Sequence, residues 1–229
     1  AEQFKATTFE SGALINDGKG HFTFQPLPRF AQAAPGYGVV AADIDADGLI
    51  EIVAVQNMFT REPETGLWRG GIGVIVEYGA NGAFRVEPPA ETGFIVDGDA
   101  KGLTLCDLDG DNRPDLVVCQ NNGKLLAWKN QSKRQPLFSV QLNGSPGNPD
   151  GIGTRIVAHY ADGTVRAAEM TAGNGYLSQS QPIVYFSTTG TPIRELEIRW
   201  PDGETTRATP DAKSPSIEIS KRLLSKATR

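Results

Sequence analysis

The feature that most constrains this chain is a nine-residue acidic loop that occurs twice, at an offset of 64 residues. The second copy, Asp107–Asp115, reads Asp-Leu-Asp-Gly-Asp-Asn-Arg-Pro-Asp and has carboxylates at positions one, three, five and nine. The first copy, Asp43–Glu51, has carboxylates at the same four positions. Apolar runs flank both copies, so each loop joins two predicted β-strands. A strand pair that recurs at a fixed spacing predicts a repeat architecture.

The acidic loops predict metal sites. Several carboxylates in one tight turn repel one another unless a cation neutralises them, and Ca2+ accepts such a flexible shell of hard oxygens. The alternative is a pair of solvated acidic turns, and the two in-register copies favour metal sites. We therefore expect Ca2+ as the cofactor. The predicted ligands are Asp43, Asp45, Asp47 and Glu51 in the first loop and Asp107, Asp109, Asp111 and Asp115 in the second.

The loops differ from the helical EF-hand. An EF-hand needs an acid at position twelve and a helix on each side, whereas position twelve is Ala54 in the first copy and Val118 in the second. Position six needs a left-handed backbone, which Gly48 and Asn112 tolerate. Another acidic pair, in Asp97-Gly-Asp99, is expected to be an ordinary turn.

A second element repeats at an offset of 62 residues, because Gly20-His-Phe22 corresponds to Gly82-Ala-Phe84. Each lies in a turn between two strand-like runs, so the repeating unit has about four strands, two around the acidic loop and then a hairpin. Such units are typical of β-propeller blades. We expect the end of one blade at residues 1–30, a complete blade at 37–95 and the start of a third at 100–130.

The number of blades is too small for closure, because a propeller needs about four to eight. We expect either that the chain is the C-terminal part of a longer propeller, with further blades upstream, or that another chain completes it. The chain begins Ala-Glu-Gln-Phe-Lys, without the basic and apolar opening of a signal peptide, which fits a mature or truncated product.

The character of the chain changes after residue 131. Residues 1–131 form the predicted propeller part, and Gln131–Pro136 is a polar linker. Residues 137–220 contain short strand-like runs between turns and predict a small β-sandwich-like domain, and residues 221–229 form a basic tail. The predicted strands of this second part are residues 138–142, 154–160, 164–170, 183–187, 193–200 and 216–219. The fold class is therefore all-β, a partial β-propeller followed by a small sandwich.

The segment between Asn57 and Gly71 has no counterpart in the second repeat. We predict an inserted loop there, which is either functional or folded back over a strand edge.

Charge is distributed unevenly along the chain. Residues 1–131 carry 18 acidic and 10 basic side chains, a net charge of −8, and residues 132–229 carry 9 and 12, a net charge of +3. No basic stripe suited to nucleic acid is present, so we expect no nucleic-acid partner. No apolar stretch approaches the ~20 residues that span a bilayer, so we expect no transmembrane segment.

The two cysteines, Cys106 and Cys119, flank the second acidic loop. In a hairpin closed by that loop, Cys119 lies opposite a residue nearer Leu103 than Cys106, which disfavours a disulfide. We expect two buried thiols instead.

Catalytic groups are scarce. The two histidines, His21 and His159, have no accompanying serine or cysteine motif, so a catalytic triad has no support. A carboxylate-pair hydrolase would use acids outside the loops, such as Asp150 and Glu169, and their spacing in the sequence decides nothing. We expect that the protein is not an enzyme.

The loop pattern Asp-x-Asp-x-Asp-Gly-x-x-[Asp/Glu] before an apolar strand resembles the FG-GAP (VCBS-type) repeats of integrin-like β-propellers. Three later stretches, Asn148–Ile156, Gly175–Gln181 and Glu197–Gly203, resemble an ASPIC/UnbV domain. The resemblance implies an extracytoplasmic location, structural calcium, and binding or adhesion rather than catalysis.

The favoured function is a calcium-binding module for binding or adhesion in an extracellular, periplasmic or cell-surface location. A protein or carbohydrate ligand would suit the amides, hydroxyls and Tyr176 in segments 143–153 and 174–181, which are equally suited to self-bonded turns. The alternatives are a purely architectural C-terminal segment of a larger secreted propeller protein and, third, an extracytoplasmic hydrolase.

Overall fold

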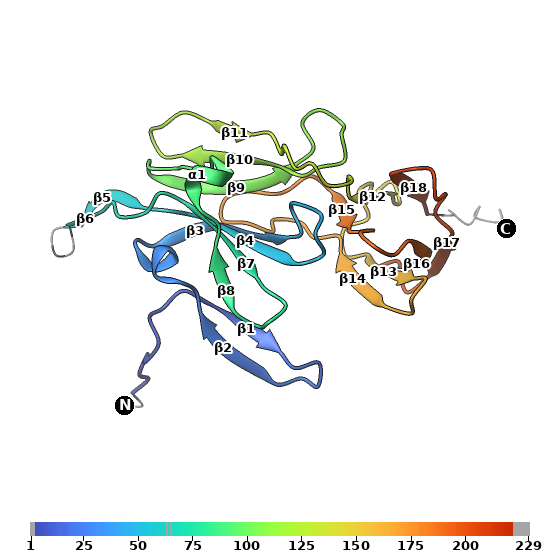
Figure 1. The fold of residues 1–229 in the computed structure, drawn as a ribbon, viewed down its shortest axis with the longest axis horizontal. Coiled ribbons are helices and arrows are strands. Elements are labelled where there is room, and N and C mark those ends of the chain that lie inside the picture. The colour runs from blue at the N-terminus through green and yellow to red at the C-terminus, as the bar shows by residue number, and fades with distance from the viewer. Residues whose placement is uncertain (1–2, 63, 65, 222–229) are drawn as a thin grey trace.

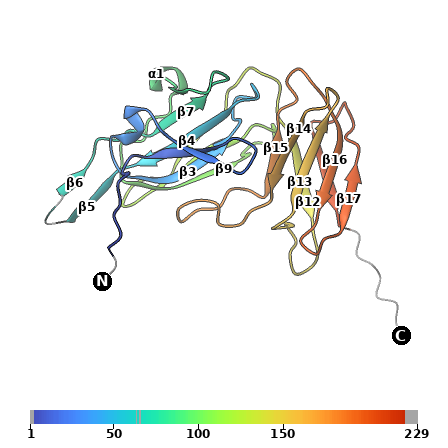
Figure 2. The same ribbon diagram turned by 90° about the horizontal axis from the view of Figure 1, so that it is seen from below.

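The structure is a computed structural model that describes residues 3–62, 64 and 66–221. It is almost entirely β, as the sequence predicts. Figure 1 shows the sheets of the first 130 residues on one side and those of the later residues on the other, and Figure 2 shows the same division from below.

The complete blade predicted at 37–95 is a four-stranded antiparallel sheet. Its strands are β3 (Gly36–Ala42), β4 (Ile50–Gln56), β7 (Val74–Tyr78) and β8 (Phe84–Val86), in that order across the sheet. The first acidic loop joins β3 to β4, and β7 and β8 form the predicted hairpin. The predicted four-strand unit is therefore confirmed.

The flanking sheets have fewer strands. Before the blade, β1 (Gly12–Asn16) and β2 (Phe22–Pro26) pair as a hairpin, followed by a 3-10 turn at Arg29–Gln32. After it come the single-turn helix α1 (Pro89–Thr92) and a sheet of order β11-β10-β9. The strands of that sheet are β9 (Ala100–Cys106), β10 (Asp115–Gln120) and β11 (Leu126–Trp128), and the second acidic loop joins β9 to β10.

The two larger sheets of the first part share one core. Val53 and Val55 of the blade pack in the same buried cluster as Leu103 and Val118 of the next sheet. The close approach of β3 to β9 requires a glycine at position 38. A Cβ on Gly38 would lie 2.7 Å from both the backbone nitrogen and the Cβ of Leu103. Burial of these branched side chains stabilises the pair of sheets.

The inserted segment is not a plain loop, and this corrects the prediction. It forms a second hairpin of β5 (Met58–Glu62) and β6 (Gly66–Trp68), which lies at the end of the molecule away from the later sheets (Figure 1). The Arg69 guanidinium lies 4.8 Å from the centre of the Phe59 ring, which adds a cation–π contact.

The second part is a two-sheet sandwich. One sheet has the order β15-β12-β18 and contains β12 (Phe138–Asn143), β15 (Ile183–Phe186) and β18 (Ser216–Ser220), with β12 and β18 parallel. The other has the order β14-β13-β16-β17 and contains β13 (Arg155–Tyr160), β14 (Val165–Glu169), β16 (Ile193–Arg199) and β17 (Thr205–Ala208). A common core that includes Val140, Ile156 and Leu196 lies between them.

The strand β17 is not among the predicted strands. Its sequence, Thr-Thr-Arg-Ala, has no apolar run, and its place in the sheet comes from antiparallel pairing with β16, where Leu196 lies opposite Ala208.

The segment that precedes β15 connects the two parts. Gln181 donates its backbone N–H to the Leu105 carbonyl (2.9 Å), and Leu105 donates its own N–H to Ser180 Oγ (3.1 Å). The Thr104 hydroxyl donates to the Gln179 carbonyl (2.8 Å). Residues 179–181 therefore run along β9 instead of forming only self-bonded turns.

The two cysteines are free thiols, as predicted, but they are not buried. Both thiols are free, and Cys119 lies opposite Gly102, as the hairpin register requires. The predicted burial is wrong for both: Cys106 is only partly buried, and Cys119 is exposed because it lies on the strand face opposite the buried Leu116 and Val118.

Among the described residues, no helix has the length and apolar character needed to cross a membrane. Residues 222–229 of the predicted basic tail lie outside the described residues.

Candidate metal centre

The first acidic loop brings three of its four predicted ligands together. Asp43, Asp45 and Glu51 each offer a carboxylate oxygen, and these three oxygens lie within 4.8 Å of one another. The fourth predicted ligand, Asp47, is outside this group and accepts the backbone N–H of Leu49 (2.7 Å).

Backbone hydrogen bonds hold the first loop. Asp43 Oδ1 accepts the N–H of Asp47 (3.1 Å), and Asp43 Oδ2 accepts the N–H of Gly48 (2.9 Å). At the end of the loop, Glu51 Oε2 accepts the N–H of Ile44 (2.7 Å). The first and ninth positions therefore fix the turn from both ends.

The second loop repeats this arrangement position by position. Asp107 accepts the N–H groups of Asp111 (3.1 Å) and Asn112 (2.9 Å), and Asp115 Oδ2 accepts the N–H of Leu108 (2.8 Å). Oxygens of Asp107, Asp109 and Asp115 lie within 4.8 Å of one another. Asp111 is outside that group, and it accepts the Arg113 backbone N–H (3.0 Å) and the Arg113 guanidinium (3.4 Å).

Each loop turns through two left-handed residues. Position six is left-handed in both copies, with φ of 90° at Gly48 and 60° at Asn112, which confirms the prediction. Position four is left-handed as well, with φ of 77° at Gly110 and 65° at Ala46. At position four, only Gly110 of the second loop indicates a left-handed backbone from the sequence, because alanine, at Ala46 in the first loop, gives no such indication. The same backbone at Ala46 is strained, because an L side chain is unfavourable there.

The first loop concentrates negative charge in a buried place. Burial first, and then the neighbouring Asp45, Asp43 and Asp47, together raise the pKa of Glu51 to about 8, against the opposing hydrogen bond from the Ile44 N–H. Burial, followed by nearby carboxylates, also raises the pKa of Asp43 and Asp45. A bound cation would remove this penalty, because it would favour the ionised form of every one of these groups.

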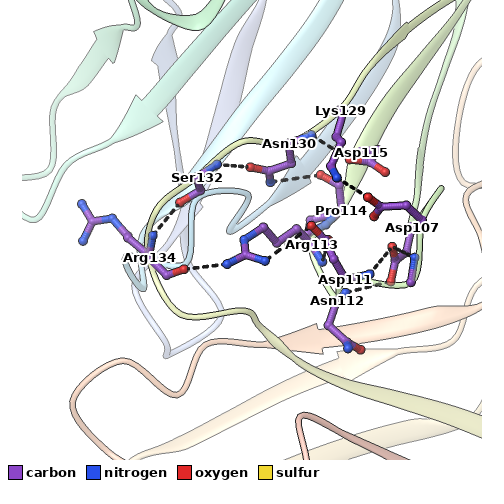
Figure 3. A network of polar contacts seen from close by, with 12 residues as sticks. Asp107, Asp111, Asn112, Arg113, Pro114, Asp115, Lys129, Asn130, Ser132 and Arg134 are labelled. Carbon is purple, nitrogen blue, oxygen red and sulfur yellow. Dashed lines mark hydrogen bonds and ion pairs between the residues drawn. The ribbon is translucent and has the colours of Figure 1, made fainter.

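Two basic side chains from the linker region approach the loops, and the sequence did not predict them. Lys129 pairs with Asp109, and this hydrogen bond lowers the pKa of the Asp109 carboxyl. Arg134 Nε lies 3.3 Å from Asp45 Oδ2, and one of its terminal nitrogens lies 3.8 Å from Asp47 Oδ2. Figure 3 shows Lys129 and Arg134 in the polar network around the second loop.

The first loop also borders a cleft of about 740 Å3. Its lining includes Asp45 and Glu51 of the loop, and also Phe94 and Trp128, whose ring centres are 4.9 Å apart. Arg134 of the linker also lines the cleft. An ion at the first loop would therefore lie beside space that a solvent molecule or ligand can reach.

The donor atoms suit a hard cation. All three close-set oxygens in each loop are carboxylate oxygens, with no sulfur or imidazole among them, which favours Ca2+ or Mg2+ over soft transition metals. Both loops can therefore hold a metal ion.

The other candidate residues do not form a comparable site. His21 is exposed and lies 3.0 Å from Asp17. Asp150 and Glu169 are both exposed, and Glu169 lies opposite Arg155 across two strands. The turn at 97–99 has a structural role, because buried Asp99 binds Lys101 Nζ (2.6 Å) and Asn121 Nδ2 (3.1 Å).

Fold and loops together define an all-β protein with two acidic, metal-capable loops at the junction of a blade-like part and a sandwich. Residues 144–222 match the family described as ASPIC and UnbV, in agreement with the predicted C-terminal domain. The assignment of the first part to FG-GAP repeats stays a prediction.

Relatives named cartilage acidic protein 1 match most of this chain. The identity is 24% over 195 residues with the Xenopus tropicalis protein, which covers 83% of this chain. It is 24% over 195 residues with the Mus musculus protein and 24% over 199 residues with the Homo sapiens protein. Each match covers 29% of the relative, so the chain spans less than a third of the length of these curated proteins.

Proposed function

We propose that this chain is a calcium-binding, extracytoplasmic module for binding or adhesion, with one structural Ca2+ in each acidic loop. The observation that supports this most is the hydrogen-bond frame that the two loops share. In both, the carboxylate at position one accepts the N–H groups of positions five and six, and the carboxylate at position nine accepts that of position two. Acidic turns that are merely solvated and bind no common ligand do not require the same set of backbone hydrogen bonds.

The choice of Ca2+ over Mg2+ rests on the ligand set. Mg2+ demands near-ideal octahedral geometry and keeps several waters, whereas Ca2+ accepts six to eight oxygens from a flexible turn. The proposed ligands are the eight carboxylates at positions one, three, five and nine. Those at position five, Asp47 and Asp111, would have to turn toward the ion or bind it through water.

Location and role are inferred from the relatives and from the scarcity of catalytic groups. Cartilage consists largely of extracellular matrix, so the name of the relatives supports an extracellular, periplasmic or cell-surface location. Among the described residues, His21 contacts Asp17 and Glu169 lies opposite Arg155, and these pairings of opposite charge favour a role in binding a protein or carbohydrate over catalysis by either group. Residues 1–131 would belong to an FG-GAP-type propeller that upstream blades or another chain complete, and residues 137–220 would be an ASPIC/UnbV-like domain.

The test is thermal unfolding of the 229-residue chain with Ca2+ and with EDTA, together with elemental analysis of the bound metal. Ca2+ at about 100 times its Kd adds about 2.7 kcal/mol per site. That corresponds to a Tm increase of roughly 5–10 °C per site in a chain of this size. An unchanged Tm with no bound Ca2+ would refute the proposal.

Site-directed variants locate the effect. Asp109→Ala should reproduce the effect of chelation at the second loop, and elemental analysis should then find one ion per chain. Asp97→Ala is the matched control, because Asp97 is an exposed aspartate outside both loops. If Asp97→Ala lowers the Ca2+-dependent Tm increase as much as Asp109→Ala does, the ion is not at the second loop.

The second candidate, a purely architectural segment, is favoured by the way the loops pack. The Thr189 hydroxyl donates to the Ala46 carbonyl (2.5 Å), and the Ser139 hydroxyl pairs with Asn112 Oδ1 (2.6 Å). Both loops thus contact the sandwich. Glycan and protein arrays distinguish the candidates, because a binding module gives specific, saturable signals and an architectural segment gives none.

A further inference from the structure

The linker between the two parts of the chain contacts both acidic loops. We define the linker strap as residues 129–134. It follows β11 and contacts the second loop through Lys129 and the first through Arg134. Figure 3 shows the strap beside the second loop. Its contacts are hydrogen bonds and ion pairs between atoms far apart in the sequence, so they fix the position of one loop relative to the other.

Asn130 is the central residue of the strap. Its backbone N–H donates to Asp115 Oδ1 (2.7 Å), the position-nine carboxylate of the second loop. Its side-chain Nδ2 donates to the Ile44 carbonyl (2.7 Å) in the first loop and to the Pro114 carbonyl (3.2 Å) in the second. Its Oδ1 accepts the Ser132 N–H (3.0 Å), which fixes the orientation of the amide.

These bonds form a continuous path between proposed ligands of the two loops. Glu51 binds the N–H of Ile44, and the carbonyl of Ile44 binds Asn130. Asn130 in turn binds Asp115, whose other oxygen binds Leu108. An ion that fixes Glu51 therefore orders Ile44, and the order extends through one side chain to the carboxylate at the end of the second loop.

The neighbours of Asn130 contact one loop or both. Lys129 pairs with Asp109 in the second loop only. Ser132 donates its hydroxyl to the Asp45 carbonyl (3.0 Å) in the first loop. Arg134 pairs with Asp45, and its carbonyl accepts the Arg113 guanidinium (2.9 Å) of the second loop. Contacts with both acidic loops therefore order the linker strap.

We propose that Asn130 couples the two ion sites, so that binding at one loop strengthens binding at the other. This inference rests on the proposed function, because it requires Ca2+ at both loops. The physical cause is the shared ordering of the strap. Binding of the first ion includes the entropic cost of ordering the linker strap. The second ion then binds next to a strap that is already ordered, so its binding free energy is more favourable. Asn130 is a positioning residue here and contacts neither ion.

The experiment is calorimetric titration of the chelator-treated chain with Ca2+. Glu51→Gln blocks the first loop and Asp109→Asn the second, and each variant should bind one ion per chain by elemental analysis. These two variants give the single-site Kd values. The coupling factor is the product of those Kd values divided by the product of the two stepwise Kd values of the unaltered chain.

We expect a coupling factor of about 5 or more in the unaltered chain, within the usual range for coupled sites. Asn130→Ala should reduce it to about 1 while both sites still bind. Asn130→Ser serves if the alanine variant does not fold, since its short side chain cannot reach the carbonyls of both loops. Urea unfolding in EDTA checks that each variant is folded.

Lys129→Gln is the matched control, because Lys129 contacts only the second loop. It should change the affinity of that loop and leave the coupling factor unchanged. Two Ca2+ ions that bind with a coupling factor of 1 in the unaltered chain would overturn the inference and leave the proposed function intact. So would a loss of coupling in Lys129→Gln equal to that in Asn130→Ala. No Ca2+ binding at all would instead contradict the proposed function.

Discussion

At the scale of single residues, the two loops differ most at position nine. Glu51 and Asp115 accept the same backbone bond, from position two of their loops. Asp115 receives a second bond, from the Asn130 N–H, and the carboxylate of Glu51 is surrounded by acidic neighbours instead. The first loop is therefore the more dependent on an external cation.

This difference predicts how stability depends on pH in EDTA. The pKa of Glu51 is about 8 in the folded chain, above its ordinary value of 4.5, so the folded state binds more protons than the unfolded state between these values. The stabilisation from protonated Glu51 is complete below about pH 4.5 and is lost as the pH rises through 8. The loss is at most about 1.4 kcal/mol per pH unit.

Urea unfolding between pH 5 and 9 measures this effect. The free energy of unfolding should decrease with pH more steeply in the unaltered chain than in Glu51→Gln, whose neutral amide does not titrate. Saturating Ca2+ should flatten the curve of the unaltered chain. Parallel curves for the two proteins in EDTA would contradict the prediction.

At the scale of elements, the contact between β3 and β9 decides how the blade packs on its neighbour. Gly38 faces Leu103 at a distance that leaves no room for a methyl group, and two of the three nearest atoms are backbone atoms that cannot rotate away. The strand β17 depends on pairing in the same way, since its sequence Thr-Thr-Arg-Ala has no apolar run of its own.

Gly38→Ala should therefore destabilise the chain by about 1–3 kcal/mol, the usual cost of overpacking a core. Gly36→Ala in the same strand is the matched control, because nothing lies within 4 Å of its added Cβ. Urea unfolding in Ca2+ compares the two. An equal effect for both would show that glycine is needed for backbone freedom in β3 and not for the approach of β9.

At the scale of the whole molecule, the two acidic loops lie where the blade-like part meets the sandwich. Thr189 and Ser139 of the sandwich contact the first and second loop, and residues 179–181 run along β9. The sandwich also has a large buried core of its own, made of residues from both its sheets. Metal should thus affect the first part and the junction more than the sandwich.

Differential scanning calorimetry tests this expectation. With saturating Ca2+ we expect one transition, because the ordered loops join the two parts. In EDTA we expect two, the earlier one from the blade-like part. The change in Trp200 fluorescence as this buried side chain becomes exposed should follow the later transition, since Trp200 lies in the sandwich core. A single transition that moves as a unit on chelation would contradict this prediction.

The sequence by itself determined the repeat, the four-strand unit, the two acidic loops and the left-handed position six at Gly48 and Asn112. These features depend on residues close together in the chain, where spacing and periodicity are directly visible. The tertiary structure alone decided the exposure of Cys119, the pairing of β17 with β16, and the contacts of the linker strap. Asn130 is 86 residues from Ile44, and such a contact forms only when the strands of both repeats have packed. The acidic loops are therefore local in their sequence signal, and their connection to each other is a property of the folded molecule.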